Sequence, residues 1–392
     1  MSTPKSAAQV TITISGPNKP ELAAQVLRVL AEAEDELLDI HQAVVGDQLT
    51  LGLVAAASPA LVEALTGVAA EMGASLHSSD APAVGAERYV LTLTGSPLQP
   101  AHLHALTSAL AEHACGVTKI TRLSQDTSRA LELALDVPQG SDFALLKANL
   151  LELAKAQGFD VALQREGFVR RNKRLLVLDM DSTLIPLEFI DEIAKMHGVS
   201  EQVSAVTERA MQGEMDYDES LRQRLGLLKG LEISKVEERA ASLPLTEGAE
   251  TLIRVLRRLG YRTAVLSGGF SVATETLKKR LHLDHAHSNV LEVEDGKLTG
   301  RVVGPVVNGA RKAVLLKSIA EAEGISLGQV MAVGDGANDI DMLGCAGLGI
   351  AFHAKAKLRA AADASFSSGG LDSILYLLGI SDAERDEVMK LA

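Results

Sequence analysis

The chain is poor in aromatic residues: it has no tryptophan, and aromatic residues make up 3% of its 392 positions. Proteins that bind single-stranded nucleic acid commonly stack bases on aromatic side chains, so this function is disfavoured. The formal net charge of −13 disfavours nucleic-acid binding in general, because an acidic chain repels phosphate backbones. Any site for a small anion must therefore carry its own cations or a metal ion.

Cysteine is also scarce. Cys115 and Cys345 lie far apart, and a disulfide framework or a zinc site would need more thiols. This usage fits a reducing cytoplasm, which is the location we expect. Met1–Gln9 lacks the apolar core of a signal peptide. The apolar stretch Leu51–Leu76 is interrupted by one proline and two glutamates, so we interpret it as a helix in a soluble domain and expect no membrane partner.

Apolar residues, by contrast, make up 47% of the chain, and its length predicts two to four domains of roughly 100–200 residues each. The first half contains one pattern twice. In the first copy, Val10–Ser15 alternates as a half-buried strand does, and Glu21–Glu34 carries apolar residues at helical spacing. The second copy begins with a similar strand at Tyr89–Thr94 and a helix at His102–Ala114. The full pattern predicts βαββαβ in each copy, with domains at 1–86 and 87–167.

Each of these units resembles the ACT family, ferredoxin-like α+β modules that bind amino acids and regulate metabolic enzymes. The resemblance implies effector loops at Gly16 and Gly95, an amino-acid effector such as L-serine, and a homodimer formed by pairing across subunits. The family's loop often has an acidic residue and a second glycine. The second copy instead has Leu98 and Ala101 there, so a ferredoxin-like module without a ligand is the alternative.

The second half has a different character. Short apolar runs at Leu175–Leu178, Thr263–Leu266 and Val330–Val333 each lead into polar residues, and helical stretches lie between them. Buried strands that alternate with helices predict a doubly wound parallel sheet over 168–392. Such sheets bind ligands at the carboxyl ends of their strands. The stretch at about 186–245 is too long for a simple crossover, so we predict a helical cap there.

The first polar cluster, Asp179-Met180-Asp181-Ser182-Thr183, follows a predicted buried strand. Alternate side chains of an extended strand share a face, so Asp179 and Asp181 can point at one centre. Two adjacent carboxylates repel each other, which favours a cation between them. Magnesium suits oxygen ligands and phosphate substrates. The alternative for this cluster is an ordinary strand-end turn.

Three further clusters follow in order. Ser267-Gly268-Gly269 offers a hydroxyl and backbone N–H groups to a phosphate oxygen. The ammonium group of Lys312 can neutralise a phosphoryl oxygen, although most lone lysines are solvated. In Gly334-Asp335-Gly336-Ala337-Asn338-Asp339 we place Asp335 in a loop and Asp339 at the start of a helix, where it can also act as a simple N-cap.

The ordered set of four clusters resembles the haloacid dehalogenase superfamily of phosphatases. Further segments narrow the resemblance to phosphoserine phosphatases, over about residues 168–380. These segments are Glu188 with Ile190-Asp191-Glu192, Glu208-Arg209-Ala210-Met211, Ser220-Leu221-Arg222-Gln223-Arg224 and Val265-Leu266-Ser267-Gly268-Gly269-Phe270.

The resemblance implies hydrolysis of O-phospho-L-serine, the final step of serine biosynthesis, through an aspartyl phosphate. Asp179 would be the nucleophile and Asp181 the general acid and base. Mg²⁺ would be held by Asp179, the main-chain carbonyl of Asp181, and Asp335. The implied phosphoryl ligands are Ser267, Gly268, Lys312 and Asn338.

The resemblance also implies contacts for the amino-acid part of the substrate. Glu188 would bind its ammonium group and Arg224 its carboxylate. Met211 and Tyr217 would form an apolar lid, and Gly269 and Asp339 would support the site, Asp339 as an anchor for Lys312.

Other functions remain open from the sequence. A related phosphatase or phosphotransferase for phosphohomoserine or phosphothreonine would use the same residues, and phosphoproteins are possible additional substrates. A regulatory amino-acid-binding protein with a vestigial catalytic half is a non-enzymatic alternative. The basic run Arg170–Arg174 suits a polyanion patch, but we interpret it as a solvated junction.

Overall fold

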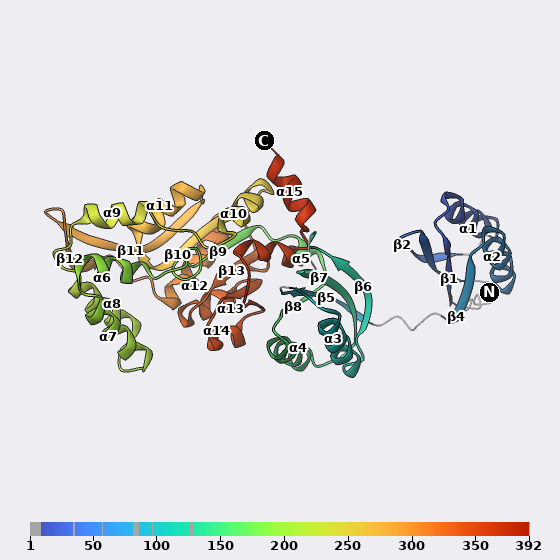
Figure 1. Ribbon diagram of the computed structural model, residues 1–392, viewed down its shortest axis with the longest axis horizontal. Coiled ribbons are helices and arrows are strands. Elements are labelled where there is room, and N and C mark those ends of the chain that lie inside the picture. The colour runs from blue at the N-terminus through green and yellow to red at the C-terminus, as the bar shows by residue number, and fades with distance from the viewer. Residues whose placement is uncertain are drawn as a thin grey trace, which may run out of the picture. The chain divides into compact units, whose positions relative to one another are not determined.

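The computed structural model describes residues 9–33, 36–56, 58–80, 86–95, 97–125 and 129–391. The chain divides into two compact units, residues 1–85 and 86–392 (Figure 1). The predicted boundary between residues 86 and 87 adjoins residues 81–85, which lie outside the described part. Each unit is built around its own apolar core.

The first unit has the predicted ferredoxin-like fold. Its four strands form an antiparallel sheet in the order β2-β3-β1-β4. Ile12 and Ile14 point to the same face of β1 and pack with apolar residues of both helices, as the alternating pattern predicts. The elements are β1 (Gln9–Pro17), α1 (Pro20–Ala33), β2 (Leu37–Val45), β3 (Gln48–Ala56), α2 (Pro59–Met72) and β4 (Ser75–Asp80).

The second unit begins with the same topology, in the strand order β8-β5-β7-β6. Its elements are β5 (Ala86–Thr94), α3 (Pro100–Glu112), β6 (Gly116–Arg122), β7 (Ala130–Pro138), α4 (Phe143–Gln157) and β8 (Asp160–Arg165).

Two glycines singled out in the sequence lie at close packing contacts. A Cβ atom on Gly16 would come within 2.5 Å of the Ala74 Cβ, and one on Gly95 within 3.2 Å of the Phe159 Cβ. Real Cβ atoms essentially never approach as closely as the first distance. Packing therefore accounts for the glycine at position 16 without reference to a ligand.

The rest of the second unit is the predicted parallel sheet. Strands β11, β10, β9, β13, β14 and β15 are mutually parallel in that spatial order, and β12 adds an antiparallel edge. The strands are β9 (Leu175–Leu178), β10 (Arg262–Phe270), β11 (His285–Glu294), β12 (Lys297–Val303), β13 (Val330–Gly334), β14 (Leu348–Phe352) and β15 (Ala364–Phe366).

Helices cover both faces of this sheet (Figure 1). Leu176 and Leu178 of β9 pack into the core under α10 and α11, whereas Leu175 and Val177 pack into the core under α12, α13 and α14. A four-residue run that is apolar on both faces is what a doubly covered parallel strand requires. These helices are α10 (Ala249–Arg258), α11 (Ser271–Leu281), α12 (Gly309–Ala322), α13 (Ile340–Cys345) and α14 (Ala356–Ala361).

The predicted cap is present between β9 and α10. It consists of α6 (Phe189–His197), α7 (Ser200–Met211), α8 (Tyr217–Leu227) and α9 (Ile233–Ala241). The hairpin of β11 and β12 supports it through backbone hydrogen bonds that join Leu298 to Gly230 and Leu231. The sequence analysis did not identify this hairpin, although Asp295-Gly296 at its turn, where both residues have positive φ, is a recognised hairpin signal. The short elements α5 (Phe168–Arg171), η1 (Leu327–Gln329), η2 (Ala337–Asp339), η3 (Leu371–Leu378) and α15 (Asp382–Lys390) complete the unit.

The basic run between the two halves is only partly the solvated junction that we expect: Arg171 and Arg174 are exposed, but Arg170 and Lys173 are buried. Arg170 is 5% exposed and its guanidinium contacts the carboxylates of Glu132 and Glu166. Lys173 is 4% exposed and donates hydrogen bonds to the carbonyls of Gly328 and Gly347, at 2.7 and 3.0 Å. Segments distant in sequence bury these two cations: the strand of Glu132 packs on Arg170, and the chain at Gly328 and Gly347 packs on Lys173.

The second ACT-like module also shares a sheet with the parallel strands. β8 pairs antiparallel with β15 at one position, Ala162 with Ala364. The side chain of Gln164 donates a hydrogen bond to the Leu377 carbonyl, and Asp160 accepts two from Ser367. The predicted domain division at residues 167 and 168 thus falls inside one compact unit and stays a prediction.

The apolar stretch Leu51–Leu76 was interpreted as one helix. In the structure it contains the end of β3, the helix α2 and the start of β4. Among the helices of the described residues, none combines the length and the apolar character that a membrane span needs.

These contacts predict that two truncations differ. A chain of residues 86–392 should unfold at the same temperature as the second unit of the full chain, because the first unit has its own core. A chain of residues 168–392 should unfold several degrees lower and aggregate, because it loses β8 from the edge of β15. Thermal unfolding and gel filtration of both chains measure this. Equal unfolding temperatures would show that the ACT-like module does not stabilise the parallel sheet.

Candidate active site

The polar clusters meet at the carboxyl edge of the parallel sheet. Asp179 directly follows β9, Ser267 lies near the carboxyl end of β10, and Asp335 directly follows β13. β9 is paired with both β10 and β13, so the ends of the three strands are neighbours. The remaining residues come from helices that begin at the same edge. The sequence pattern therefore places the clusters correctly, since parallel strands end together.

A fully buried lysine lies at the centre of the site. Lys312, on the first turn of α12, is 0% exposed, and its Nζ lies 2.7 Å from Asp179 Oδ1 and 2.7 Å from Asp339 Oδ1. Burial lowers the pKa of this ammonium, but the two carboxylates outweigh burial and raise it above its ordinary value. Lys312 is thus a permanent cation that joins α12 to the end of β9 and the start of α13.

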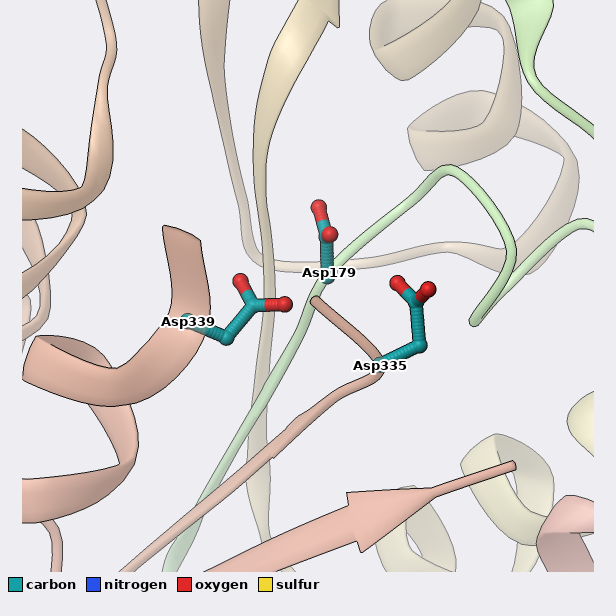
Figure 2. A group of neighbouring side chains, drawn as sticks. All are labelled: Asp179, Asp335 and Asp339. Atoms are coloured by element: carbon teal, nitrogen blue, oxygen red, sulfur yellow. The ribbon is translucent and has the colours of Figure 1, made fainter. Parts of the chain in front are cut away.

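Three carboxylates surround a space that suits a metal ion. Asp179, Asp335 and Asp339 each offer an oxygen, and these oxygens lie within 4.8 Å of one another. Figure 2 shows the three side chains projecting into this space from separate segments. Both oxygens of Asp339 already accept hydrogen bonds, from Lys312 and from the Gly336 N–H. Asp179 and Asp335 are therefore the side chains best placed to hold a cation.

Burial and charge repulsion perturb the pKa values of Asp179 and Asp335. Burial, and then the charges of Asp339 and Glu188, raise the pKa of Asp335 to about 7. Burial and the Asp339 charge also raise the pKa of Asp179, while Lys312 opposes this. Carboxylates held this close repel one another when ionised, so the arrangement favours either a bound proton or a cation among them.

Asp181 lies between the strand end and the cap. Its Oδ1 accepts a hydrogen bond from the N–H of Phe189, the first residue of α6, at 2.8 Å, and its Oδ2 accepts one from the Ser267 hydroxyl at 3.2 Å. Burial, followed by the charge of Glu188, raises the Asp181 pKa to about 7. A carboxyl group with a pKa near neutrality can both donate and accept a proton, as general acid–base catalysis requires.

β10 becomes irregular after Leu266, and this irregular end, the Ser267 loop, is shaped by its glycines. The Ser267 hydroxyl accepts a hydrogen bond from the Gly269 N–H at 2.8 Å. A Cβ on Gly269 would come within 2.7 Å of Asp181 Oδ2, and a Cβ on Gly268 would overlap the Tyr217 hydroxyl. Glycine is therefore needed at both positions for the loop to approach the reacting groups.

Asn289 is a site residue that sequence reasoning missed. It is 2% exposed, donates a hydrogen bond to the Gly268 carbonyl at 2.8 Å, and accepts one from the Val307 N–H at 2.8 Å. It holds the Ser267 loop in place from β11. Asn308, which caps α12, also donates to Asp218 of the cap at 3.1 Å. No local motif marks Asn289, because its partners are distant in sequence, and for Asn308 the N-cap of α12 is a local signal whereas its contact with Asp218 is not.

The cap contributes several of the predicted residues. The Tyr217 hydroxyl donates to the Gly268 carbonyl at 3.0 Å, and burial raises its pKa to about 12. Glu188 accepts a hydrogen bond from the Ser182 hydroxyl at 3.0 Å, in a turn where Ser182 has a positive φ of 56°. Met211 ends α7, and its side chain lies outside the described part.

Arg224 lies on α8 of the cap and is half-buried. Its Nε donates a long hydrogen bond of 3.4 Å to the Ser220 carbonyl of its own helix. Its positive charge lowers the pKa values of Tyr217 and Asp191, while burial raises both. Within the described residues its guanidinium has no carboxylate at ion-pair distance. Asn338, on η2 beside Asp339, is also half-buried.

Comparison with known proteins identifies the families to which the two halves of the chain are similar. Family models match a haloacid dehalogenase-like hydrolase over residues 176–344 and an ACT domain twice, over 8–80 and 88–164. A phosphoserine phosphatase of Mycobacterium tuberculosis is 40% identical over 386 residues, which cover 96% of this chain and 94% of that protein.

Two solved structures are also similar. A probable phosphoserine phosphatase from Vibrio cholerae, in unliganded form, has a TM-score of 0.59 and 35% identity, and the match covers 77% of this chain and 89% of that one. A phospho-aspartyl intermediate analogue of a phosphoserine phosphatase has a TM-score of 0.50 and 48% identity, over 52% of this chain and 98% of that one.

The doubly wound sheet with carboxylates at its edge defines the class as a haloacid dehalogenase-like hydrolase with two ACT domains. The similarity to the mycobacterial enzyme extends over nearly all of both chains. This chain therefore belongs to the phosphoserine phosphatase family and is a phosphoric monoester hydrolase.

Lys312→Met should destabilise the protein in a pH-dependent way. The change leaves two buried carboxylates without their cation, which costs about 3–5 kcal/mol when both are ionised. Loss of the Lys312 charge would raise the folded-state pKa of Asp179 further above its ordinary value, so the variant would lose more stability as the pH rises. The deficit in the free energy of unfolding should thus be larger at pH 8 than at pH 5.5. Urea titrations at both pH values measure it, with exposed Lys317→Met on the same helix as the control. A deficit independent of pH would contradict the ion-pair account.

Proposed function

We propose that this chain hydrolyses O-phospho-L-serine to L-serine and phosphate, with Asp179 as the nucleophile. The observation that carries this is the buried carboxylate of Asp179 at the strand end, held by Lys312 and close to a second carboxylate of raised pKa, Asp181. A phosphate monoester is hard to hydrolyse directly, and a covalent intermediate divides the reaction into two steps. The similar phospho-aspartyl analogue structure supports the same intermediate.

In the first step, an Asp179 oxygen forms a bond to phosphorus while the bond from phosphorus to the serine oxygen breaks. Asp181 donates its proton to the departing serine oxygen. In the second step, Asp181 takes a proton from a water molecule whose oxygen attacks phosphorus, which releases phosphate and restores Asp179. An Asp181 pKa of about 7 suits both transfers.

The phosphoryl oxygens need positive partners in this acidic site. Lys312 supplies a fixed charge, and Ser267, the Gly268 N–H and Asn338 supply hydrogen bonds in our proposal. Asp179, Asp335 and the main-chain carbonyl of Asp181 would hold Mg²⁺. The bound ion would neutralise phosphoryl charge and align it with the nucleophile. The raised pKa values of Asp179 and Asp335 support this assignment.

The amino-acid part of the substrate would bind the cap. Glu188 is exposed and raises the pKa values of Asp181 and Asp335 by its charge, so it lies near the reacting groups and can accept an ammonium group. Among the described residues the guanidinium of Arg224 has no carboxylate at ion-pair distance, so its planar fork can bind the carboxylate of a substrate. Tyr217, and in our proposal Met211, would cover the bound substrate and exclude water.

The two ACT domains suggest regulation. We propose that they bind an amino acid, with the end product L-serine as the first candidate, in loops around Gly16 and Gly95, and that they pair across subunits in a homodimer. The ACT family matches support amino-acid binding in general terms. Equilibrium dialysis with L-serine, together with sedimentation, tests both proposals.

Phosphate release from L-phosphoserine, with and without Mg²⁺, tests the proposed reaction. We expect Mg²⁺-dependent release, a preference over phosphothreonine, phosphohomoserine and an aryl phosphate, and no turnover by Asp179→Asn, because an amide is not a nucleophile. Unfolding in urea checks that the variant is folded. Turnover by the folded variant at the wild-type rate would remove Asp179 from the mechanism.

Arg224→Ala should affect substrates unequally. Loss of a charge-assisted hydrogen bond costs about 1.5–3 kcal/mol, which is roughly 10- to 100-fold in kcat/KM for phosphoserine. An aryl phosphate has no carboxylate, so its kcat/KM should change by less than about threefold. Steady-state kinetics on both substrates decide this, with exposed Arg222→Ala on the same helix as the control. Equal losses on both substrates would assign Arg224 a structural role.

Asp335→Asn should stabilise the metal-free protein while it removes the metal response. The folded-state pKa of Asp335, about 7, lies above its unfolded value, so its ionisation destabilises the fold progressively until pH 7 is passed. The amide should thus raise Tm by about 2–4 °C per kcal/mol relieved, more at pH 8 than at pH 5. Mg²⁺ should raise the wild-type Tm but not that of the variant, and exposed Asp341→Asn serves as the control. A wild-type-sized Mg²⁺ shift in Asp335→Asn would exclude Asp335 as a ligand.

A further inference from the structure

A cavity of about 360 Å³ lies where the second ACT domain meets the parallel sheet, within the unit of residues 86–392. One wall comes from α4 and the start of β8, and the other comes from α14 and β15. Its volume is within the range of small-molecule sites, about 300–1,000 Å³. None of the proposed catalytic, metal or substrate residues lines it.

The floor of this cavity is apolar. Leu151, Phe159 and Val161 line it from the ACT domain, and Phe159 and Val161 are 3% and 4% exposed. Ala356 and Ala360 face it from α14. Small side chains on one wall and large apolar ones on the other leave room for the apolar body of a ligand.

The charged groups of the cavity favour an anionic ligand. Lys155 lines it from α4 and Arg359 from α14, and among the described residues neither forms an ion pair. The carboxylate of Asp160 is already held by the Ser367 N–H and hydroxyl, at 2.9 and 2.7 Å. Glu152 remains for an ammonium group, if the ligand carries one. Two unpaired cations on opposite walls, in a chain of net charge −13, are complementary to a carboxylate.

A buried hydroxyl gives an independent indication. Ser365 lines the cavity, and its Oγ, which is inaccessible to solvent, has no hydrogen-bond partner among the described residues. Buried polar groups in native proteins are normally hydrogen-bonded, so an unpaired one requires an explanation. A change of the Ser365 side-chain rotamer would turn this hydroxyl into the cavity, where a ligand oxygen or nitrogen would supply the missing partner.

The cavity wall is connected to the proposed metal site. α14 begins directly after Lys355, whose backbone N–H donates a hydrogen bond to the Asp335 carbonyl at 3.2 Å. α14 also packs against η2, which carries Asn338 and Asp339. One helix therefore has the cavity on one side and the metal-site loop on the other.

We propose that this cavity is a regulatory site for a small carboxylate with an apolar body, and that its binding between α4 and α14 changes the cation affinity at Asp335. The coupling rests on the proposed role of Asp335 in metal binding, whereas the binding itself does not. Coupling of this kind is reciprocal, so the cation also changes the affinity for the carboxylate by the same factor.

Binding is tested by calorimetry of the full chain with 3-phenylpropanoate, without Mg²⁺ or substrate. We expect saturable binding that is about tenfold weaker or more for the uncharged 3-phenylpropanamide, for Arg359→Gln and for Lys155→Gln. Lys357→Gln, an exposed residue of α14 that does not line the cavity, should bind as the wild type does. Ser365→Ala should weaken binding yet unfold at an equal or higher temperature than the wild type, because it removes an unpaired buried hydroxyl.

No binding, or binding that Arg359→Gln and Lys155→Gln leave unchanged, would overturn the site. Binding that only Arg224→Ala removes would place the carboxylate in the active site instead and would also overturn it.

Coupling is tested by titrating Mg²⁺ with and without 3-phenylpropanoate. A change in Mg²⁺ affinity of about fivefold or more, absent in Arg359→Gln, is expected. Unchanged Mg²⁺ affinity would overturn the regulatory role. Failure of the enzyme to release phosphate from phosphoserine would refute the proposed function but leave the binding results as they are, so the two failures are distinguishable.

Discussion

The active site depends on one buried ion cluster, the ammonium of Lys312 between the carboxylates of Asp179 and Asp339. Removing charges from water is costly, and such a cluster is stable only when the opposite charges meet at hydrogen-bond distance. The cluster ties together three chain segments, the end of β9, the first turn of α12 and the start of α13. Because Lys312 is the shared partner, the position of the proposed nucleophile is determined by residues more than a hundred positions away in the sequence.

The same cluster leaves the site with an excess of negative charge. Asp181, Asp335 and Glu188 lie near it, and the pKa values of Asp181 and Asp335 rise to about 7 as a result of burial and repulsion. A phosphate dianion would add to this repulsion. The electrostatic arrangement therefore favours a cation in the site, and the close oxygens of Asp179 and Asp335 are an acidic group that could hold it. The ionised forms of Asp181 and Asp335 destabilise the folded state, and we interpret these two residues as retained for chemistry rather than for stability.

The second ACT domain is structurally continuous with the catalytic sheet. β8 extends the sheet at β15, and the buried Arg170 and Lys173 fill the junction with ion pairs and hydrogen bonds. A rigid junction of this kind can transmit a change in one domain to the other, because packed interfaces have few alternative arrangements. The helix α14 lies at this junction and contacts the metal-site loop through Lys355.

Local sequence patterns predicted the parallel strands that carry the site and the four polar clusters at their ends, but they misassigned Leu51–Leu76, which contains parts of two strands as well as a helix. The continuous apolar run Leu175–Leu178 predicts a doubly covered strand, and parallel strands end at one edge, so Asp179, Ser267 and Asp335 had to meet. The hairpin of β11 and β12 was missed despite its Asp295-Gly296 turn. The burial of Arg170 and Lys173 and the support of Gly268 by Asn289 came only from the tertiary structure, whereas the family resemblance already implied the pairing of Asp339 with Lys312. In each of these cases the partner is distant in sequence, and burial and charge pairing are properties of the neighbours that folding supplies, which no local pattern contains.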